Sequence, residues 1–441
     1  MLKARYILRL IGAFVARFRT LIVISILFGV GFFFILKLLL PLLMGEGIER
    51  IGITGRFTTT NLPIAILDMI GDGLTKLDAT GNVEPNLAES WETPDNGKTW
   101  IFHLRRDVLW QDGTRVVSSG ITYQFSDVTI ERPDDATIIF KLQTSYSAFP
   151  AVLTRPAFRK GLLGTGEWEV KNLSLNISFV DSLTIEKKDS GKIIYKFYPT
   201  EEKTKLAFEL GQVDEITDIF NPSPLDTWKK ANVTTFSNAG EFVAIFFNTQ
   251  DKILADKSIR QALSYAINKE RFGGVRAISP ISKESWAYNS QVKPYNYDLQ
   301  KALETIADYK KSSKTDTLEI GITTSPILLK QAELIVKDWE ALGVKVNLQV
   351  FSGIPSDYQS LLAIFDTPDD PDQYSIWHST QTETNITRYQ NPRIDKLLED
   401  GRSQINIEDR KKTYLNFQRF LVEDSPAAFL YYPVTYKINR R

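Results

Sequence analysis

The residues that most suggest chemistry lie in an acid-rich segment, AIFDTPDDPDQYSIWHS, over residues 363–379. Its acidic and imidazole side chains are Asp366, Asp369, Asp370, Asp372 and His378. Clustered carboxylates are common calcium ligands, but this spacing lacks the glycine and the distal glutamate of an EF-hand loop. A solvated turn shaped by its prolines is the plain interpretation of the same residues. The segment alone therefore indicates no calcium site.

The residue types that the chain lacks exclude several kinds of catalytic and metal site. It has no cysteine and only two histidines, His103 and His378. Disulfides, thiolate nucleophiles, Cys-ligated zinc, iron–sulfur clusters and sites with several histidines are thereby excluded. The G-x-S-x-G, H-E-x-x-H and G-x-x-x-x-G-K-[ST] motifs are missing from the sequence as well. We predict a protein that is not an enzyme and that uses no metal and no cofactor.

The charge distribution disfavours nucleic acid as a partner. Six of the 53 basic residues and none of the 53 acidic ones lie within residues 1–44, so the rest of the chain carries a net charge of −6. Binding to nucleic acid draws its affinity largely from basic side chains that displace counterions from phosphates. A chain with a negative balance lacks this source of affinity.

An apolar stretch near the N-terminus predicts a membrane anchor over residues 20–44. This stretch reaches about 36 Å as a helix, enough for a tilted crossing of the bilayer. Five basic residues precede it and Glu46 and Glu49 follow it. The positive-inside rule therefore predicts a cytoplasmic tail over residues 1–19 and an extracytoplasmic domain after the anchor. A cleaved signal peptide is the alternative, with Gly45-Glu46-Gly47 as its only candidate cleavage site.

The residues beyond the anchor show the periodicity of an α/β fold. Alternating apolar residues at 318–322 and 344–350 flank a helical pattern that ends at Gly343, which predicts a β–α–β unit with parallel strands. Two further helices are predicted after the capping residues Thr200 and Asp256. Strand patterns occur at 99–104, 136–142, 192–198 and 241–248.

Five strings of the sequence resemble the family 5 extracytoplasmic solute-binding proteins, the peptide- and nickel-binding subunits of ABC importers. They follow that family's order over residues 51–435. The strings are NLAESWETPDNGKTWIFHLRRDVLWQDGT (86–114), GTGEWEV (164–170), KLAFELGQVDEI (205–216), FFNTQDKILADKSIRQALSYAINKE (246–270) and NITRYQNPRIDKLLEDGRS (385–403).

This resemblance implies a two-lobed, periplasmic-binding-protein-like fold of the class II type. Lobe 1 would comprise residues 48–240 plus 426–441, and lobe 2 would comprise residues 241–425. The chain would cross between the lobes near Gly240 and near Pro426, which permits a hinge motion. A small accessory unit of lobe 1 is expected to be missing or reduced, because the chain passes quickly from residues 112–120 to the next strand.

The function implied by the resemblance is that of a membrane-anchored receptor. It would bind oligopeptides, or a related small solute, in a cleft between the lobes and deliver them to an ABC permease in the same bilayer. A membrane-tethered solute sensor that uses the same binding fold is the alternative. Direct coordination of nickel is disfavoured, because the chain offers only two histidines and three methionines.

The resemblance also suggests which residues contact the ligand. In peptide-binding members, an aspartate shortly before a DP motif holds the terminal ammonium, and Asp366 is the best match to it, with Asp369 as runner-up. Phe365 and His378, from the same segment, are further candidates for the cleft. The match departs from the family pattern, since Ala363-Ile364-Phe365 stands where a Gly-Trp pair is expected and one extra residue precedes Pro371. His378 also fits a purely structural role.

Overall fold

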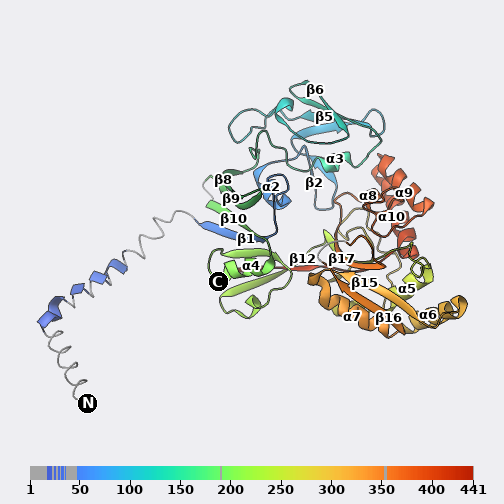
Figure 1. Ribbon diagram of the computed structural model, residues 1–441. Coiled ribbons are helices and arrows are strands. Elements are labelled where there is room, and N and C mark those ends of the chain that lie inside the picture. Colours follow the sequence, from blue (N-terminus) through green and yellow to red (C-terminus); the bar gives the residue numbers. More distant parts are fainter. Residues whose placement is uncertain are drawn as a thin grey trace, which may run out of the picture.

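A computed structural model describes residues 17–21, 24–25, 28–29, 31–33, 35, 47–188, 191–351 and 355–440. The predicted tail (1–19) and anchor (20–44) lie largely outside these ranges. Within the described ranges, no helix has the length and apolar character that a membrane crossing requires. The described residues from Gly47 onward form two lobes that face one another (Figure 1).

Lobe 1 is built on a seven-stranded sheet with the strand order β12-β19-β11-β1-β10-β9-β8. These strands are β1 (Ile48–Thr54), β8 (Trp168–Asn176), β9 (Phe179–Lys187), β10 (Gly191–Tyr198), β11 (Glu215–Ile219), β12 (Ala231–Ser237) and β19 (Val434–Arg440). The central β1 runs parallel to both of its neighbours. Helix α4 (Glu201–Glu209) packs on these strands. The predicted cap is confirmed, because the Thr200 side chain accepts a hydrogen bond from the backbone N–H of Lys203.

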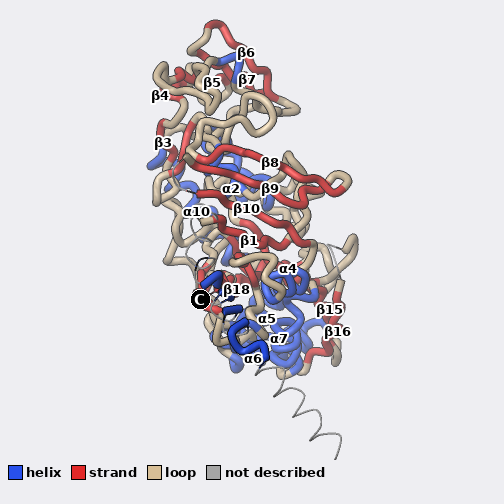
Figure 2. The backbone as a smooth tube through the Cα atoms, turned by 90° about the vertical axis from the view of Figure 1, so that its left-hand side faces the viewer, coloured by secondary structure: helices blue, strands red, loops and turns tan. Residues whose placement is uncertain are grey.

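A second unit of lobe 1, which we call the accessory sheet, is antiparallel and ordered β4-β5-β7-β6. Its strands are β4 (Ala88–Glu92), β5 (Thr99–Leu104), β6 (Val128–Asp134) and β7 (Thr137–Leu142). The same unit contains the two-stranded sheet of β2 (Thr75–Leu77) and β3 (Val83–Pro85) and the short helix α3 (Phe149–Val152). Trp100, Phe102 and Phe140 belong to a core of its own. Figure 2 shows the accessory sheet above the seven-stranded sheet. Although we expected an accessory unit to be missing or reduced, this one is present with its own core.

Lobe 2 is built on a six-stranded sheet with the order β14-β18-β13-β17-β15-β16. Its strands are β13 (Glu241–Phe247), β14 (Val275–Arg276), β15 (Leu318–Thr324), β16 (Val344–Val350), β17 (Ser360–Asp366) and β18 (Ala427–Tyr432). One face carries α5 (Lys257–Ala266), α6 (Leu299–Ser313) and α7 (Leu329–Glu340), and the other carries α8 (Tyr374–Trp377), α9 (Pro392–Ser403) and α10 (Ile407–Asp424). The predicted β–α–β unit is confirmed as β15, α7 and β16, with parallel strands.

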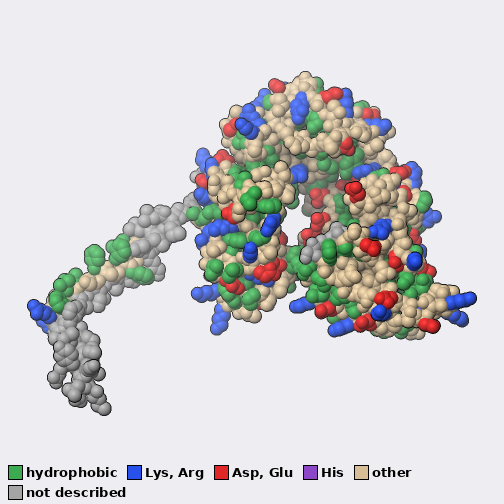
Figure 3. All heavy atoms as spheres, in the orientation of Figure 1, with side chains coloured by type: hydrophobic (Ala, Val, Ile, Leu, Met, Phe, Trp, Pro, Cys, Tyr) green, Lys and Arg blue, Asp and Glu red, His purple; other side chains and the backbone are tan. Residues whose placement is uncertain are grey.

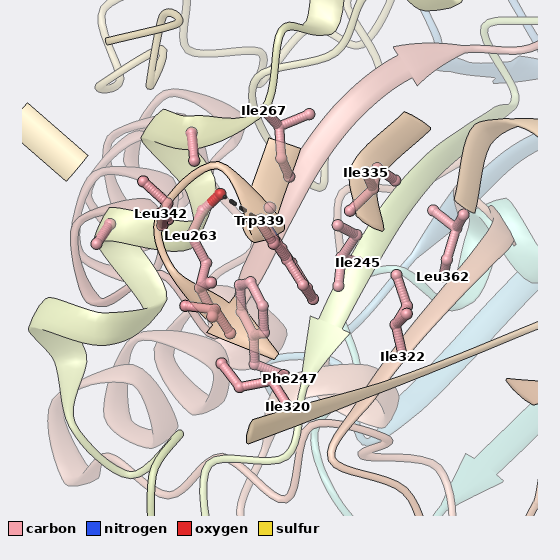
Figure 4. Packing of buried hydrophobic residues seen from close by; sticks show 14 of the residues in the cluster. Ile245, Phe247, Leu263, Ile267, Ile320, Ile322, Ile335, Trp339, Leu342 and Leu362 are labelled. Carbon is pink, nitrogen blue, oxygen red and sulfur yellow. Dashed lines mark hydrogen bonds between the residues drawn. The ribbon is translucent and has the colours of Figure 1, made fainter. Parts of the chain in front are cut away.

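Trp339 of α7 anchors the core between the lobe 2 sheet and its first helical layer (Figure 4). Its ring stacks on Phe247 of β13 at a centroid distance of 6.4 Å. The indole N–H donates to the carbonyl oxygen of Leu263 on α5 at 3.1 Å, so this fully buried polar group is satisfied. One side chain thereby ties α7, α5 and the sheet into a single rigid layer.

The chain passes between the two sheets twice. The first crossing joins β12 to β13 through residues 238–240, as the sequence predicted. The second lies at Pro433 rather than near Pro426, because β18 pairs with β13 and β14 whereas β19 pairs with β11 and β12. Every residue of β18 is buried, and its apolar run AAFLYY fits an interior strand of lobe 2. Residues 427–432 therefore belong to the sheet of lobe 2.

Candidate interlobe binding site

A cavity of about 960 Å³ lies between the two lobes. Lobe 1 lines most of it through helix α2 (Ile64–Ile70), the turn that follows and the start of the β2–β3 hairpin, while lobe 2 contributes Asp369. The space-filling view shows a hollow between the lobes with Asp and Glu side chains along its walls (Figure 3). This is the position in which a two-lobed protein can enclose a small ligand.

The turn after α2 packs closely against the backbone that follows α3, because Gly73 has no side chain. A Cβ atom at this position would lie 2.3 Å from the carbonyl oxygen of Thr154 and 2.5 Å from that of Leu153. Both are backbone atoms and cannot move aside as a flexible side chain would. The glycine therefore lets the wall of the cavity fold tightly against the chain that follows α3.

Two arginines hold the acid-rich segment of lobe 2, which we call the acid loop (366–373). The guanidinium of Arg410 donates to both carboxylate oxygens of Asp370, at 2.7 and 3.1 Å. Arg402 donates from Nε to Asp372 at 2.9 Å. Both arginines come from helices packed behind the loop, α9 and α10. The loop is therefore fixed from behind, and two of its carboxylates are neutralised there.

Asp369 is the aspartate of the acid loop that lines the cavity. Among the described residues it makes no hydrogen bond or ion pair. Burial, followed by the nearby negative charge of Asp370, raises the pKa of Asp369 above its ordinary value. The side chain is open to the cavity yet partly desolvated by the surrounding protein. A carboxylate in this situation gains more from a cationic ligand than one in bulk water does.

Lobe 1 presents a second carboxylate to the same cavity. Asp68 of α2 lies on its wall, and burial raises the pKa of Asp68, with further contributions from the charges of Asp369 and Asp72. Asp72 itself is engaged, since it accepts hydrogen bonds from Asn86 and Thr165. Asp68 and Asp369 thus repel one another across the two lobes. A positive group between them would remove this repulsion.

The cavity continues toward a basic region of lobe 1. A neighbouring cavity of about 510 Å³ shares Leu67, Val152 and Arg155 with it. Lys160 and Arg159 lie on the wall of this second cavity, and Arg159 pairs with Asp112 at 3.1 Å. The combined space is acidic where the lobes meet, and Arg155 and Lys160 make it basic farther along lobe 1. Such a gradient suits an extended ligand with a positive end and a negative end.

Asp366 and Phe365, predicted from the resemblance, are placed at the end of β17. Asp366 pairs across the sheet with Glu241 of β13, and it is not among the residues that line the interlobe cavity. Phe365 packs its half-buried ring on Phe242 and Phe246, at centroid distances of 5.8 and 5.5 Å. Both residues belong to the end of β17, where the acid loop begins, and of these three candidates only Asp369 lines the cavity.

His378 is buried behind the acid loop. Its ring stacks on Tyr374 at 4.0 Å, and Nδ1 lies 2.8 Å from the hydroxyl of Thr380. Nε2 points toward Glu399 of α9 at 3.5 Å. His378 is not among the residues that line the interlobe cavity. The geometry places it between α8 and α9, where it packs the two helices together.

Sequence reasoning missed Asp68, and no local signal could have found it. The residue lies in an ordinary helical stretch, IAILDMI, with no neighbouring motif. Its importance arises from the approach of lobe 2, which is a tertiary property. As for metals, the described part of the chain contains no group of three or more His, Asp or Glu side chains that could hold an ion.

Comparison with known proteins identifies the family to which the chain is similar. Residues 82–385 match the family described as bacterial extracellular solute-binding proteins, family 5 Middle. The chain is 23% identical to the oligopeptide-binding protein AppA of Bacillus subtilis (strain 168), over 86% of this chain and 83% of that protein. It is 26% identical to the nickel-binding periplasmic protein of Escherichia coli (strain K12), over 64% of this chain and 65% of that protein.

Solved structures show the same fold. NikZ from Campylobacter jejuni, in complex with Ni(L-His), matches with a TM-score of 0.71 and 21% identity, over 89% of this chain and 94% of that chain. AppA from Bacillus subtilis, in complex with a nonapeptide, matches with a TM-score of 0.67 and 20% identity, with the same coverage. Because the family match spans more than half of its residues, the chain belongs to family 5 of the bacterial extracellular solute-binding proteins.

Proposed function

We propose that this protein is a membrane-anchored extracytoplasmic receptor that binds oligopeptides between its lobes and delivers them to an ABC permease in the same membrane. Its family supports the binding of a solute outside the cytoplasm. Relatives named for oligopeptide and dipeptide binding support peptides as the ligand class. Nickel is a poorer fit, because two histidines and three methionines supply few of the ligands that it prefers.

The observation that carries this proposal is the unpaired carboxylate of Asp369 in the interlobe cavity. The terminal ammonium of a peptide would lie between Asp369 and Asp68, where it offsets the repulsion of the two carboxylates. The carboxylate end of the peptide would point toward Arg155 and the basic region of lobe 1. Apart from Asp72 and Lys76, the remaining walls of the interlobe cavity are uncharged, which suits a receptor that tolerates many side chains.

We expect trialanine to raise the thermal midpoint of the full chain and N-acetyl-trialanine to have a much smaller effect. Asp369→Asn should weaken the binding of trialanine roughly 10- to 100-fold, since hydrogen bonds to charged groups contribute about 1.5–3 kcal/mol. Isothermal titration calorimetry with both peptides measures the difference.

Asp366→Asn is the matched variant, because it removes a carboxylate three residues away that does not line the cavity. It should leave the affinity for trialanine unchanged. Equal affinity of Asp369→Asn and the wild type, or a loss confined to Asp366→Asn, would contradict the assignment of the ammonium to Asp369. If neither peptide binds the wild type, peptide capture itself is refuted.

The anchor over residues 20–44 is part of the same proposal and has its own test. Its apolar length and basic flank favour a single crossing with the N-terminus in the cytoplasm. We expect the full chain to stay in the membrane fraction of its host when the membranes are washed with alkaline carbonate. Recovery of the chain in the wash, or an N-terminus that begins after residue 44, would refute an uncleaved anchor.

A further inference from the structure

Arg402, near the C-terminus of α9, lies between aromatic rings of both lobes. Its guanidinium carbon is 4.6 Å from the ring centroid of Tyr146 in lobe 1 and 4.3 Å from that of Tyr374 in lobe 2. The Tyr374 ring in turn stacks on His378. A guanidinium over an aromatic face is attracted by the quadrupole of the ring, most strongly where water is partly excluded. This stack therefore runs from lobe 1 into the interior of lobe 2.

Ser147, the residue after Tyr146, contacts the end of the same helix. Its backbone N–H donates to the carbonyl oxygen of Arg402 at 2.7 Å, and its hydroxyl donates to that of Gly401 at 3.1 Å. The last carbonyls of a helix have no partner within the helix and carry the negative end of its dipole. A residue of lobe 1 thus caps a helix of lobe 2, and opening of the lobes would return these carbonyls to water.

Both sides of this contact are held rigidly. Tyr146 is fixed in lobe 1, because its N–H donates to the carbonyl oxygen of Gly97 at 3.0 Å and its own carbonyl accepts from Trp100 Nε1 at 3.2 Å. In lobe 2, α9 packs closely on α10 at Gly401, where a Cβ atom would lie 2.7 Å from the ring of Tyr414. Rigid partners lose little conformational entropy when they meet, which favours their association.

The contact is also connected to the acid loop. The guanidinium that faces Tyr146 also donates to Asp372, and Asp372 lies three residues after the cavity carboxylate Asp369. Movement of the acid loop would therefore move Arg402 relative to lobe 1. Arg402 therefore couples the position of the acid loop to the closure of the lobes.

We propose that Tyr146 and Ser147 of lobe 1, with Arg402 and Tyr374 of lobe 2, form an interlobe latch. The latch holds the lobes closed even without a ligand, and it lies on α9, away from the two strand crossings of the hinge. Arg402 acts as a positioning residue, because it reaches the ligand space through Asp372 rather than by contact. A closed state that is already populated lets the ligand select it rather than create it.

The absence of cysteine makes the latch directly measurable. Ser126 of lobe 1 and Asn416 of lobe 2 are exposed, so Ser126→Cys with Asn416→Cys provides two sites for spin labels in the full chain. We expect the interlobe distance distribution, measured by double electron–electron resonance without added peptide, to be dominated by one short distance. Arg402→Gln should lower the ratio of closed to open molecules roughly two- to fivefold.

Tyr146→Leu tests the latch from lobe 1 and leaves the Arg402–Asp372 pair intact. It should shift the distribution in the same direction as Arg402→Gln. Arg393→Gln is the matched control, because Arg393 lies on the same helix and stacks on Phe420 at 4.5 Å within lobe 2. The proposal is overturned by a wild-type distribution without a dominant short distance, by two unchanged latch variants, or by an equal shift in Arg393→Gln. None of these outcomes depends on whether peptides bind.

Discussion

Replacement of Arg410 by methionine is expected to lower the free energy of unfolding by about 3–5 kcal/mol, because it leaves a buried carboxylate without its partner. The side chains of Arg410 and Asp370 are only 7% and 12% exposed and form two hydrogen bonds with one another. Burial alone would lower the pKa of Arg410, but the charge of Asp370 raises it above the ordinary value. Urea-induced unfolding of the full chain, followed by tryptophan fluorescence, measures the loss.

The double variant Arg410→Met with Asp370→Asn separates the destabilisation caused by the unpaired carboxylate from that caused by the lost packing of the arginine side chain. Once the carboxylate is neutral, most of the destabilisation should be recovered, because the larger part of the cost is the unpaired charge. The matched control is Arg105→Met, which breaks a pair with Asp107 on the surface and should change stability by about 0.5 kcal/mol or less. If Arg410→Met were as mild as Arg105→Met, the acid loop would not depend on this pair.

The same pair illustrates what the sequence could and could not predict. Helix α4, its cap at Thr200 and the β15–α7–β16 unit were predicted correctly, since each is specified by neighbours in the chain. The partners of Asp370 and Asp372 lie 40 and 30 residues away on two other helices. No local pattern states which aspartate of the acid loop is neutralised and which one remains for a ligand.

The second crossing between the lobes was misplaced for a similar reason. The run AAFLYYPVTYKI reads as two strands around a proline, and both are apolar enough for either sheet. Strand pairing decides between the two sheets: β18 forms hydrogen bonds with β13 and β14, whereas β19 forms them with β11 and β12. Strand order is a tertiary outcome, and hydrophobic alternation specifies only which face of a strand is buried.

Glu241 is expected to make stability depend on pH near neutrality. It lies at the start of β13, just after the first crossing, and pairs across the sheet with Asp366. Burial, followed by the charges of Asp366 and of Asp218 in lobe 1, raises the pKa of Glu241 to about 7. Like charges that face one another on adjacent strands are unfavourable, so the folded state retains a proton that the unfolded chain has lost.

The direction of the effect follows from this proton. Below the ordinary glutamate pKa of about 4.5 the residue is neutral in both states, and Glu241 then costs no stability. As the pH rises from about 4.5 to about 7, the unfolded state gains by ionising and the folded state does not, so stability falls. Partial exposure weakens the effect, and we expect a loss of about 1–3 kcal/mol above pH 7.

Glu241→Gln removes this penalty and should therefore stabilise the protein at pH 8 by about 1–3 kcal/mol, with no gain at pH 4.5. Urea unfolding at both pH values measures the difference, and exposed Glu383→Gln is the matched control that should change neither. Asp366→Asn should deliver only part of the gain, because burial is the larger cause and remains. A gain of equal size at both pH values would mean that glutamine packs better at this position and that the ionisation of Glu241 plays no part.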